Sequence, residues 1–435
     1  MARRLPPTWL MGLANLPFSI SSTILLITVP QLLAARHVPE PAIASITAFA
    51  LIPGFVVFLV SPILDVRFSR RSYAIAMALT SALLTFIALS RLDNLTALRW
   101  LLFFANVAAC LFQGALGGWV ASLVPADEES RLGAWFTVAN IGGFGIDAIL
   151  NITLFRALPE PFGALAIVGI GLMPLLLFLM IPAPGPDRRL AGESFANFFD
   201  ALAQMIRRPT VIRTLVIFAM PAACFAVTNM LGGLGVDFTA SERVVGLVAG
   251  IGVTIAGVIG SLIVPPLSRR IGAYRLYLAI GVTGALFTLS LLTLARTPLS
   301  FAWAMIGKNV AQAAAFSAAN TIIFNQIGKA NPLAATEFTV LTSAVLLPLS
   351  YVQWADGQGY AHAGLSGALV TDSALGLGGC AIIMLLLMRW PPPPFECRQR
   401  HHWNGRLTLV TPPHFGIVTS CIALLNRESQ SKTSY

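Results

Sequence analysis

Long apolar runs, each followed by a short polar connection, recur along most of the chain. Twelve of them are long enough to cross about 30 Å of hydrocarbon as a helix. They cover residues 10–34, 42–64, 73–91, 96–122, 133–155, 163–182, 211–235, 244–266, 275–295, 299–325, 335–357 and 366–388. The runs lack the polar alternation of membrane β-barrel strands. The pattern therefore predicts an all-α polytopic membrane protein with twelve transmembrane helices.

The widest polar connection, residues 183–210, separates two sets of six spans. It contains an amphipathic segment, residues 195–208, whose apolar residues recur at helical spacing. Arg207 and Arg208 end this segment, and we expect it to lie on the cytoplasmic membrane surface. The expected parts are an N-terminal six-helix bundle (1–182), the linker (183–210), a C-terminal six-helix bundle (211–388) and a basic, proline-rich cytoplasmic tail (389–435).

Two connections of the first half recur in the second half. The stretch 61–71 (SPILDVRFSRR) is followed 204 residues later by 265–275 (PPLSRRIGAYR). The stretch 125–136 is followed about 202 residues later by 331–338. Two pseudo-symmetric halves with the same topology are typical of transporters built from parallel repeats.

The basic residues lie mostly on one side of the predicted spans. Alternate connections, together with both termini, contain 21 Lys and Arg residues, and the opposite connections contain 6. The positive-inside rule therefore places both termini in the cytoplasm, and a span count wrong by one would break this alternation. We expect an integral protein of the bacterial inner (plasma) membrane.

Composition excludes several other classes of protein. Of the 435 residues, 56% are hydrophobic and 11% are charged, whereas soluble domains have about 25% charged residues. The net charge of +10 is explained by topology, so we expect no nucleic-acid partner. The five cysteines form no cluster with histidine that would bind a metal, and no nucleotide-binding loop is found. We therefore expect no cofactor, no metal and an ion gradient as the energy source.

The connection after the second span resembles the loop signature of the major facilitator superfamily. The matching residues are Asp65, Arg67, Arg70 and Arg71. Ser61 and Phe68 stand where that signature has glycine. Three segments further resemble the AmpG and acetyl-CoA transporter family, namely SPILD with its arginine pair, SRLGAWF at 130–136 and ATEFTVLTS at 335–343. This resemblance implies proton symport of muropeptides into the cell, with siderophores or acetyl-CoA as the cargo of related members.

The same loops contain candidate gating residues. A carboxylate at a helix end beside basic residues can form a latch that closes one side in one state and breaks in the other. Asp65 is the candidate carboxylate and Arg131 a candidate partner, whereas Arg269 occupies the equivalent position in the second half. The candidate gating residues are Asp65, Arg70, Arg71, Arg131, Arg269, Arg270 and Glu337. Alternatively, the arginines only set the topology and Glu337 only stabilises a helix N-terminus.

Two ionisable residues, Asp147 and Lys308, lie inside predicted spans. A charge there costs about 2.5–3.5 kcal/mol on insertion scales and normally faces a cavity or a partner. The two residues could form an ion pair, bind substrate or couple protons, and a structural pair is the alternative. Spans 1, 4, 7 and 10 border the cavity in the superfamily's architecture. This adds four candidate lining amides: Asn15, Gln113, Asn229 and Gln312.

These features predict a secondary active transporter that moves a small polar solute by alternating access, with protons and the lipid bilayer as its other partners. We expect a monomer without enzymatic activity. A membrane enzyme acting on lipid-linked substrates is one alternative, but its candidate groups are scattered along the chain. Those groups are His37, His362, Asp237, Glu242, Asp356 and Asp372. A non-transporting sensor of the same fold is the other alternative, because both loop glycines and the second aspartate are missing.

Overall fold

The computed structural model describes residues 5–66, 68–159, 161–183, 195–231, 233–328 and 331–390. Within these ranges the chain forms helices and turns and no strand, which confirms the all-α prediction. The predicted tail from residue 391 onward and residues 184–194 of the predicted linker lie outside the described residues.

The first six spans consist of α-helices joined or interrupted by short 3-10 and π segments. Their elements are α1 (Thr8–Leu13), α2 (Leu16–Thr23), η1 (Ile24–Thr28), α3 (Val29–Ala35), α4 (Glu40–Leu51), α5 (Pro53–Val56), η2 (Val57–Leu59), η3 (Ser61–Asp65), α6 (Arg70–Leu89), α7 (Leu95–Leu123), α8 (Glu129–Thr137), η4 (Val138–Gly142), α9 (Gly143–Ala157), α10 (Phe162–Leu172) and η5 (Met173–Leu179). We call this part of the chain the N-terminal half.

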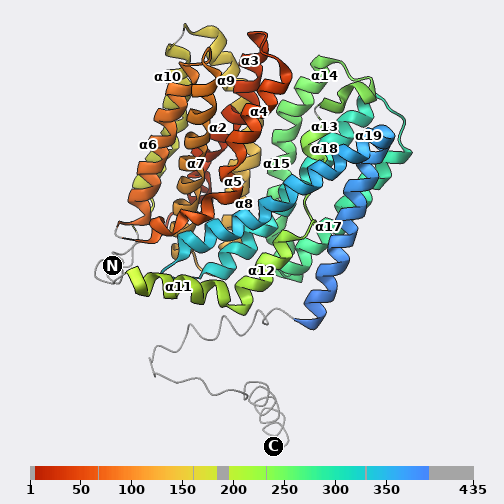
Figure 1. The fold of residues 1–435 in the computed structure, drawn as a ribbon. Coiled ribbons are helices and arrows are strands. Elements are labelled where there is room, and N and C mark those ends of the chain that lie inside the picture. The colour runs from red at the N-terminus through yellow and green to blue at the C-terminus, as the bar shows by residue number, and fades with distance from the viewer. Residues whose placement is uncertain are drawn as a thin grey trace, which may run out of the picture. The chain divides into compact units, whose positions relative to one another are not determined.

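The second part begins with α11 (Phe195–Arg207), and we call the helices after it the C-terminal half. Those helices are α12 (Pro209–Ala219), α13 (Thr228–Leu231), η6 (Gly233–Phe238), α14 (Glu242–Leu247), η7 (Val248–Gly252), α15 (Val253–Leu262), α16 (Val264–Ile271), α17 (Ala273–Ser290), η8 (Leu291–Thr293), α18 (Pro298–Ile327) and α19 (Ala334–Arg389). In Figure 1 most of the N-terminal half lies on the left and most of the C-terminal half on the right.

Nine helices of the described residues are long and apolar enough to cross a membrane. The longest, α19, contains two of the predicted spans, because Ala363 and Gly364 leave the helical conformation and turn the chain back. Gly359 and Gly367 lie in contact on either side of this turn. The 30-residue α18 and the interrupted segment from α12 to η6 account for the two remaining predicted spans.

The break in the seventh span has a local cause. Pro221 follows the end of α12, and a proline disfavours helical conformation in the residue before it. Residues 220–227 are therefore not helical, and Phe225 adopts a left-handed backbone conformation. This break directs the backbone N–H of Val227 toward Asp372 in the interior of the C-terminal half.

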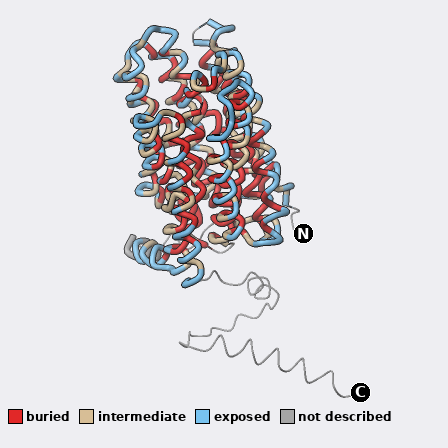
Figure 2. The backbone as a smooth tube through the Cα atoms, turned by 90° about the vertical axis from the view of Figure 1, so that its right-hand side faces the viewer, coloured by how far each residue is buried: buried red, intermediate tan, exposed pale blue. Residues whose placement is uncertain are grey.

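Buried residues follow the interior of the helix bundle, and exposed residues follow its outside (Figure 2). Many exposed side chains are large and apolar, including Leu179, Leu299 and Trp303. Contact with lipid tails accounts for such a surface on a membrane protein, whereas an extensive apolar surface on a soluble monomer is rare.

Glycines allow α9 and the η7 segment to pack closely. A Cβ atom added at Gly145 would lie 2.3 Å from the backbone oxygen of Gly250. We expect Gly145→Ala to destabilise the protein by about 1–3 kcal/mol, because the two backbones would have to separate. Gly169→Ala is the matched control, since a Cβ there meets nothing within 4 Å. Thermal unfolding in detergent measures both, and equal melting temperatures would contradict the prediction.

Candidate functional site

Asp65 joins the two halves at the predicted cytoplasmic end. Its carboxylate accepts hydrogen bonds from Nε of Arg70 at 2.7 Å, from the backbone N–H of Thr336 at 2.8 Å and from the Thr336 hydroxyl at 2.7 Å. The backbone N–H of Ala335 lies 3.3 Å from the same carboxylate. Asp65 is only 5% exposed. We call Asp65, Arg70 and their partners in residues 331–336 the Asp65 latch.

The Asp65 latch also caps a helix. No side chain of the residues just before α19 caps it, so its first N–H groups would otherwise lack acceptors. The Asp65 carboxylate, from the other half, accepts hydrogen bonds from two of these groups and lies at the positive end of the helix dipole. Separation of the halves at this end therefore costs α19 its N-terminal cap.

The other predicted gating residues have different partners. Nη2 of Arg70 donates to the backbone oxygens of Asn331 and Pro332 at 3.1 Å and 2.9 Å. Arg71 lies over the ring of Trp119. The proposed pairing of Arg131 with Asp65 is wrong, because Arg131 forms an ion pair with Glu128, three residues before it. This local pair keeps Arg131 on the surface of its own helix.

A second contact between the halves lies at the pseudo-symmetric position. The hydroxyls of Ser130 and Ser268 are 2.7 Å apart, and Nη2 of Arg269 donates to the backbone oxygen of Asp127 at 3.3 Å. Arg269, at the position equivalent to Asp65, donates to a backbone oxygen in this contact, so the two contacts between the halves are chemically different. Arg270 is exposed.

Apolar side chains close the space beside the two contacts between the halves. The rings of Phe136, Phe324 and Phe338 form a triangle with centroids 5.6 Å, 5.6 Å and 5.7 Å apart. All three rings are almost fully buried, and Phe136 belongs to the half opposite to the other two. The halves are therefore packed together at this end.

The linker helix α11 covers the same region. Met205 is fully buried against Leu333, with Val66 and Val340 packed beside them. Arg208, just after α11, lies 3.7 Å from the buried Glu337 carboxylate. Glu337 also accepts a hydrogen bond from Asn331 at 2.5 Å. Glu337 thus joins the linker to the loop that holds the Asp65 latch.

Lys308 lies in a buried ion pair within the C-terminal half. Its Nζ donates to Oδ2 of Asp372 at 2.6 Å and to the hydroxyl of Thr288 at 2.8 Å, and it lies 5.0 Å from the centroid of the Phe225 ring. Lys308 is fully buried and Asp372 is 5% exposed. The predicted pairing of Lys308 with Asp147 is not found, because Asp147 lies in α9 of the other half.

Asp356 adds a second carboxylate to this region. It is fully buried, and neither of its oxygens has a hydrogen-bond partner among the described residues. Val352, one helical turn before Asp356, lines the same small hollow as Asp372, so Asp356 lies on the helix face next to the ion pair. We call Lys308, Asp356 and Asp372 the Lys308 group. With all three ionised, its formal charge is −1, so it lacks one positive charge.

A hollow with an empty volume of about 230 Å³ borders the Lys308 group. Its lining residues are Pro221, Ala222, Cys224, Phe225, Gly281, Ala285, Val352, Asp372 and Gly376. The break in the seventh span contributes four of them, and the backbone N–H of Val227 in the same break lies 3.4 Å from Oδ1 of Asp372. The irregular backbone therefore helps to hold the ion pair beside the hollow.

Asp147 has a different environment in the N-terminal half. Its Oδ2 accepts a hydrogen bond from the hydroxyl of Ser19 at 2.9 Å. One turn earlier along α2, Nδ2 of Asn15 donates to Oδ1 of Asn140 at 2.5 Å. Asp147 is 7% exposed and forms no ion pair with the described basic residues. Polar groups of α2 and the fifth span therefore gather around it.

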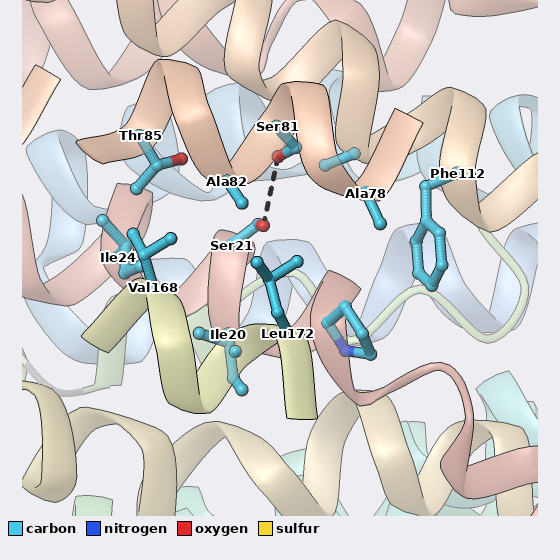
Figure 3. A pocket seen from close by; sticks show the side chains of 13 residues that line it. Ile20, Ser21, Ile24, Ala78, Ser81, Ala82, Thr85, Phe112, Val168 and Leu172 are labelled. Atoms are coloured by element: carbon cyan, nitrogen blue, oxygen red, sulfur yellow. Dashed lines mark hydrogen bonds between the residues drawn. The ribbon is translucent and has the colours of Figure 1, made fainter. Parts of the chain in front are cut away.

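The four predicted lining amides differ in exposure. Asn15, Gln113 and Gln312 are buried at 0%, 7% and 8% exposure, whereas Asn229 is exposed beside the break in the seventh span. A larger hollow, with an empty volume of about 370 Å³, lies between α2, α6, α7 and α10 (Figure 3). Its wall is apolar apart from Ser21, Ser81 and Thr85, and none of the predicted amides lines it.

The sequence analysis named Asp356 and Asp372 only as scattered acids and gave Ser19 and Thr336 no role. Asp372 lies six residues inside the predicted span 366–388, and Asp356 lies at the end of 335–357. The search for charges inside spans that selected Lys308 could therefore have found both. Ser19 and Thr336 carry no such signal, because hydroxyl residues are common in membrane helices.

Comparison with known proteins agrees with this architecture. A family model described as Major Facilitator Superfamily matches residues 11–346. No curated protein matches the chain. Among solved structures, the human organic anion transporter MFSD10 (TETRAN) is 16% identical with a TM-score of 0.66, covering 87% of this chain and 100% of that chain.

Two further solved structures are similar over most of their length. A bacterial homologue of the iron transporter ferroportin, in an outward-facing state, is 15% identical with a TM-score of 0.64, covering 87% of this chain and 99% of that chain. The proton:xylose symporter XylE is 16% identical with a TM-score of 0.62, covering 88% and 95%. At these identities the likeness establishes the fold. With the family match over most of the chain, it follows that this protein belongs to the Major Facilitator Superfamily and is an integral membrane transporter rather than an enzyme.

Proposed function

We propose that the protein is a proton-coupled secondary transporter of a small polar solute, placed in the bacterial inner membrane with both termini in the cytoplasm. The observation that carries proton coupling is the Lys308 group, whose formal charge of −1 lies buried among apolar helices. A proton on Asp356 would neutralise the group without disturbing the ion pair between Lys308 and Asp372.

Loss of that proton would change the balance of charges inside the C-terminal half. The Lys308 ammonium would then be attracted by two carboxylates on the two arms of α19 instead of one. A lysine that can shift between two acidic partners is a two-state element of the kind that can link protonation to a change of packing. Hydrophobic surroundings strengthen this effect, because charges interact more strongly away from water.

The contacts between the halves support alternating access. The Asp65 latch, the Ser130–Ser268 contact and the triangle of phenylalanine rings all join the halves toward the predicted cytoplasmic end. We assign the observed conformation to an outward-facing state, in which this end is closed. Opening it would require the Asp65 latch to break and α19 to lose its cap.

The resemblance to the AmpG family makes an anhydro-muropeptide the first solute to test. We expect labelled anhydro-muropeptide to enter proteoliposomes that contain the purified protein, faster with an inward proton gradient than without it. Empty liposomes and a collapsed gradient are the controls. If folded protein gives no uptake, the muropeptide assignment fails, and siderophores and acetyl-CoA are tested next. Uptake that is indifferent to the gradient would contradict proton coupling.

A further inference from the structure

The N-terminal half contains a cluster of oxygen atoms that the proton-coupling proposal does not use. The side chains of Asn15 and Ser19, at the start of α2, face Asn140 in η4 and Asp147 in α9. Asn15 is fully buried, Ser19 is 1% exposed and Asp147 is 7% exposed. We call these four residues the Asp147 cluster. Asn140 is partly exposed, so the cluster lies at the edge of the buried interior.

The Ser19 hydroxyl lies between two acceptors in the Asp147 cluster. The hydroxyl of Ser19 lies 2.9 Å from Oδ2 of Asp147 and 3.1 Å from the backbone oxygen of Asn140. A serine hydroxyl carries a single proton, so it can donate fully to only one of these two acceptors. The other oxygen receives at most a share of this hydrogen bond.

Another acceptor in the cluster lacks a donor. Asn15 donates through Nδ2 to Oδ1 of Asn140, and its own Oδ1 is buried without a hydrogen-bond partner. Such an atom costs about 1–3 kcal/mol when nothing compensates it. Asn15 and Ser19 are four residues apart, so they lie on the same helix face. The unpartnered oxygen and the crowded hydroxyl therefore belong to one site.

A bound cation would compensate both deficits. Carboxylate, hydroxyl, amide and backbone oxygens are the ligands that hard cations prefer. Transporters often present such oxygens where a membrane helix is interrupted. The π segment η4 interrupts the fifth span at Asn140, and π segments recur at functional sites. The Asp147 cluster thus combines oxygen ligands that suit a hard cation with an interrupted membrane helix.

Charge decides which cation suits the site. Asp147 is the one formal charge of the Asp147 cluster, and the described basic residues form no ion pair with it. A monovalent ion neutralises it, whereas a divalent ion would leave an uncompensated positive charge within the membrane. A proton on Asp147 would supply a second hydrogen at Ser19 but would leave Oδ1 of Asn15 unpartnered. We propose that the Asp147 cluster binds one sodium ion.

A glycine gives this site its space. A Cβ atom at Gly143 would lie 3.0 Å from the hydroxyl of Ser19 and 3.4 Å from Oδ2 of Asp147. The absence of a side chain there lets the carboxylate lie close to the serine. Gly143→Ala therefore narrows the site without removing a ligand.

The test is the melting temperature of the purified full-length protein in detergent. NaCl is titrated against choline chloride at constant total salt, and the titration is repeated with KCl. A ligand that binds only the folded state raises the melting temperature, so we expect a saturable rise with Na⁺. Asp147→Asn should weaken the apparent Na⁺ affinity at least tenfold, and Ser19→Ala and Gly143→Ala by smaller factors. Asp93→Asn, on the exposed surface, is the matched control and should keep the wild-type response.

Any of three results would overturn the sodium site. The first is an equal response of the wild-type protein to NaCl, KCl and choline chloride, and the second is a Na⁺ response that Asp147→Asn retains. The third is a response to pH that Asp147→Asn abolishes while Na⁺ has no effect, which would assign a proton to the site. If Asp147→Asn does not fold, Ser19→Ala and Gly143→Ala still test the sodium site, because both are expected to weaken the apparent Na⁺ affinity. Because no transported solute is needed, failure of the muropeptide or proton proposal would leave this result intact.

Discussion

Lys308→Ala is expected to abolish uptake and to lower the stability of the folded protein. The substitution leaves Asp372 and Asp356 as two unpaired carboxylates in a buried region. Breaking a buried ion pair by removing one partner costs about 3–5 kcal/mol. Gradient-driven uptake into proteoliposomes and thermal unfolding in detergent measure the two effects. Lys432→Ala makes the same chemical change in the C-terminal segment and is the matched control.

A double variant separates loss of fold from loss of function. Lys308→Ala combined with Asp372→Ala removes both charges of the pair, so we expect it to recover part of the stability that either single variant loses. It should not recover uptake, because the double variant lacks the Lys308 ammonium that is proposed to shift between Asp356 and Asp372. Strictly additive losses of stability would show that the two residues are not coupled. Uptake at the wild-type rate by the double variant would remove the Lys308 group from the transport mechanism.

Asp65→Asn is expected to shift the protein toward a state that is open at the predicted cytoplasmic end. The asparagine keeps one acceptor oxygen but loses the charge that pairs with Arg70 and caps α19. Hydrogen bonds to charged groups contribute about 1.5–3 kcal/mol. Since about 1.4 kcal/mol corresponds to a tenfold change in an equilibrium, the open population should rise roughly tenfold to a hundredfold.

Cysteine labelling can measure this shift. Thr321 lies where α18 meets Gly133 of the other half and is 2% exposed. In a background without the native cysteines, Thr321→Cys should react with a membrane-impermeant maleimide at least tenfold faster when Asp65→Asn is present. Asp93→Asn disrupts an exposed aspartate–arginine pair, with Arg36 at 2.6 Å, and should leave the rate unchanged. Equal labelling rates in all three proteins would show that the Asp65 latch does not hold this end closed.

Much of the fold was accessible from the sequence because the bilayer imposes a simple rule on it. A helix that crosses about 30 Å of hydrocarbon needs roughly 20 apolar residues, and the predicted runs agree with the observed helices to within a few residues. The two spans within α19 were also predicted separately, as 335–357 and 366–388. The structure adds the turn between them, where Ala363 and Gly364 leave the helical conformation.

The sequence did not predict which charged residues pair with one another inside the membrane. Sequence position placed Lys308 and Asp147 at similar depths, and depth alone allowed them to meet. The tertiary structure places them in different halves and brings Lys308 to Asp372, because α18 packs against α17 and the second arm of α19. The depth of a residue in the membrane follows from its distance along the predicted span. Which residues meet at one helix interface depends on how the helices pack.

The sequence by itself determined the helical class, the span positions and the asymmetry of basic charge, since each depends on local composition. It also selected Asp65, Arg70 and Arg71 as candidate gating residues of one short loop, whereas the pairing of Asp65 with Arg70 comes from the structure. Only the tertiary structure decided that Asp65 caps α19 of the other half, that Arg131 turns to Glu128 and that Ser19 crowds Asp147. These contacts join residues more than a hundred positions apart or depend on side-chain direction, and both are set by how the helices pack.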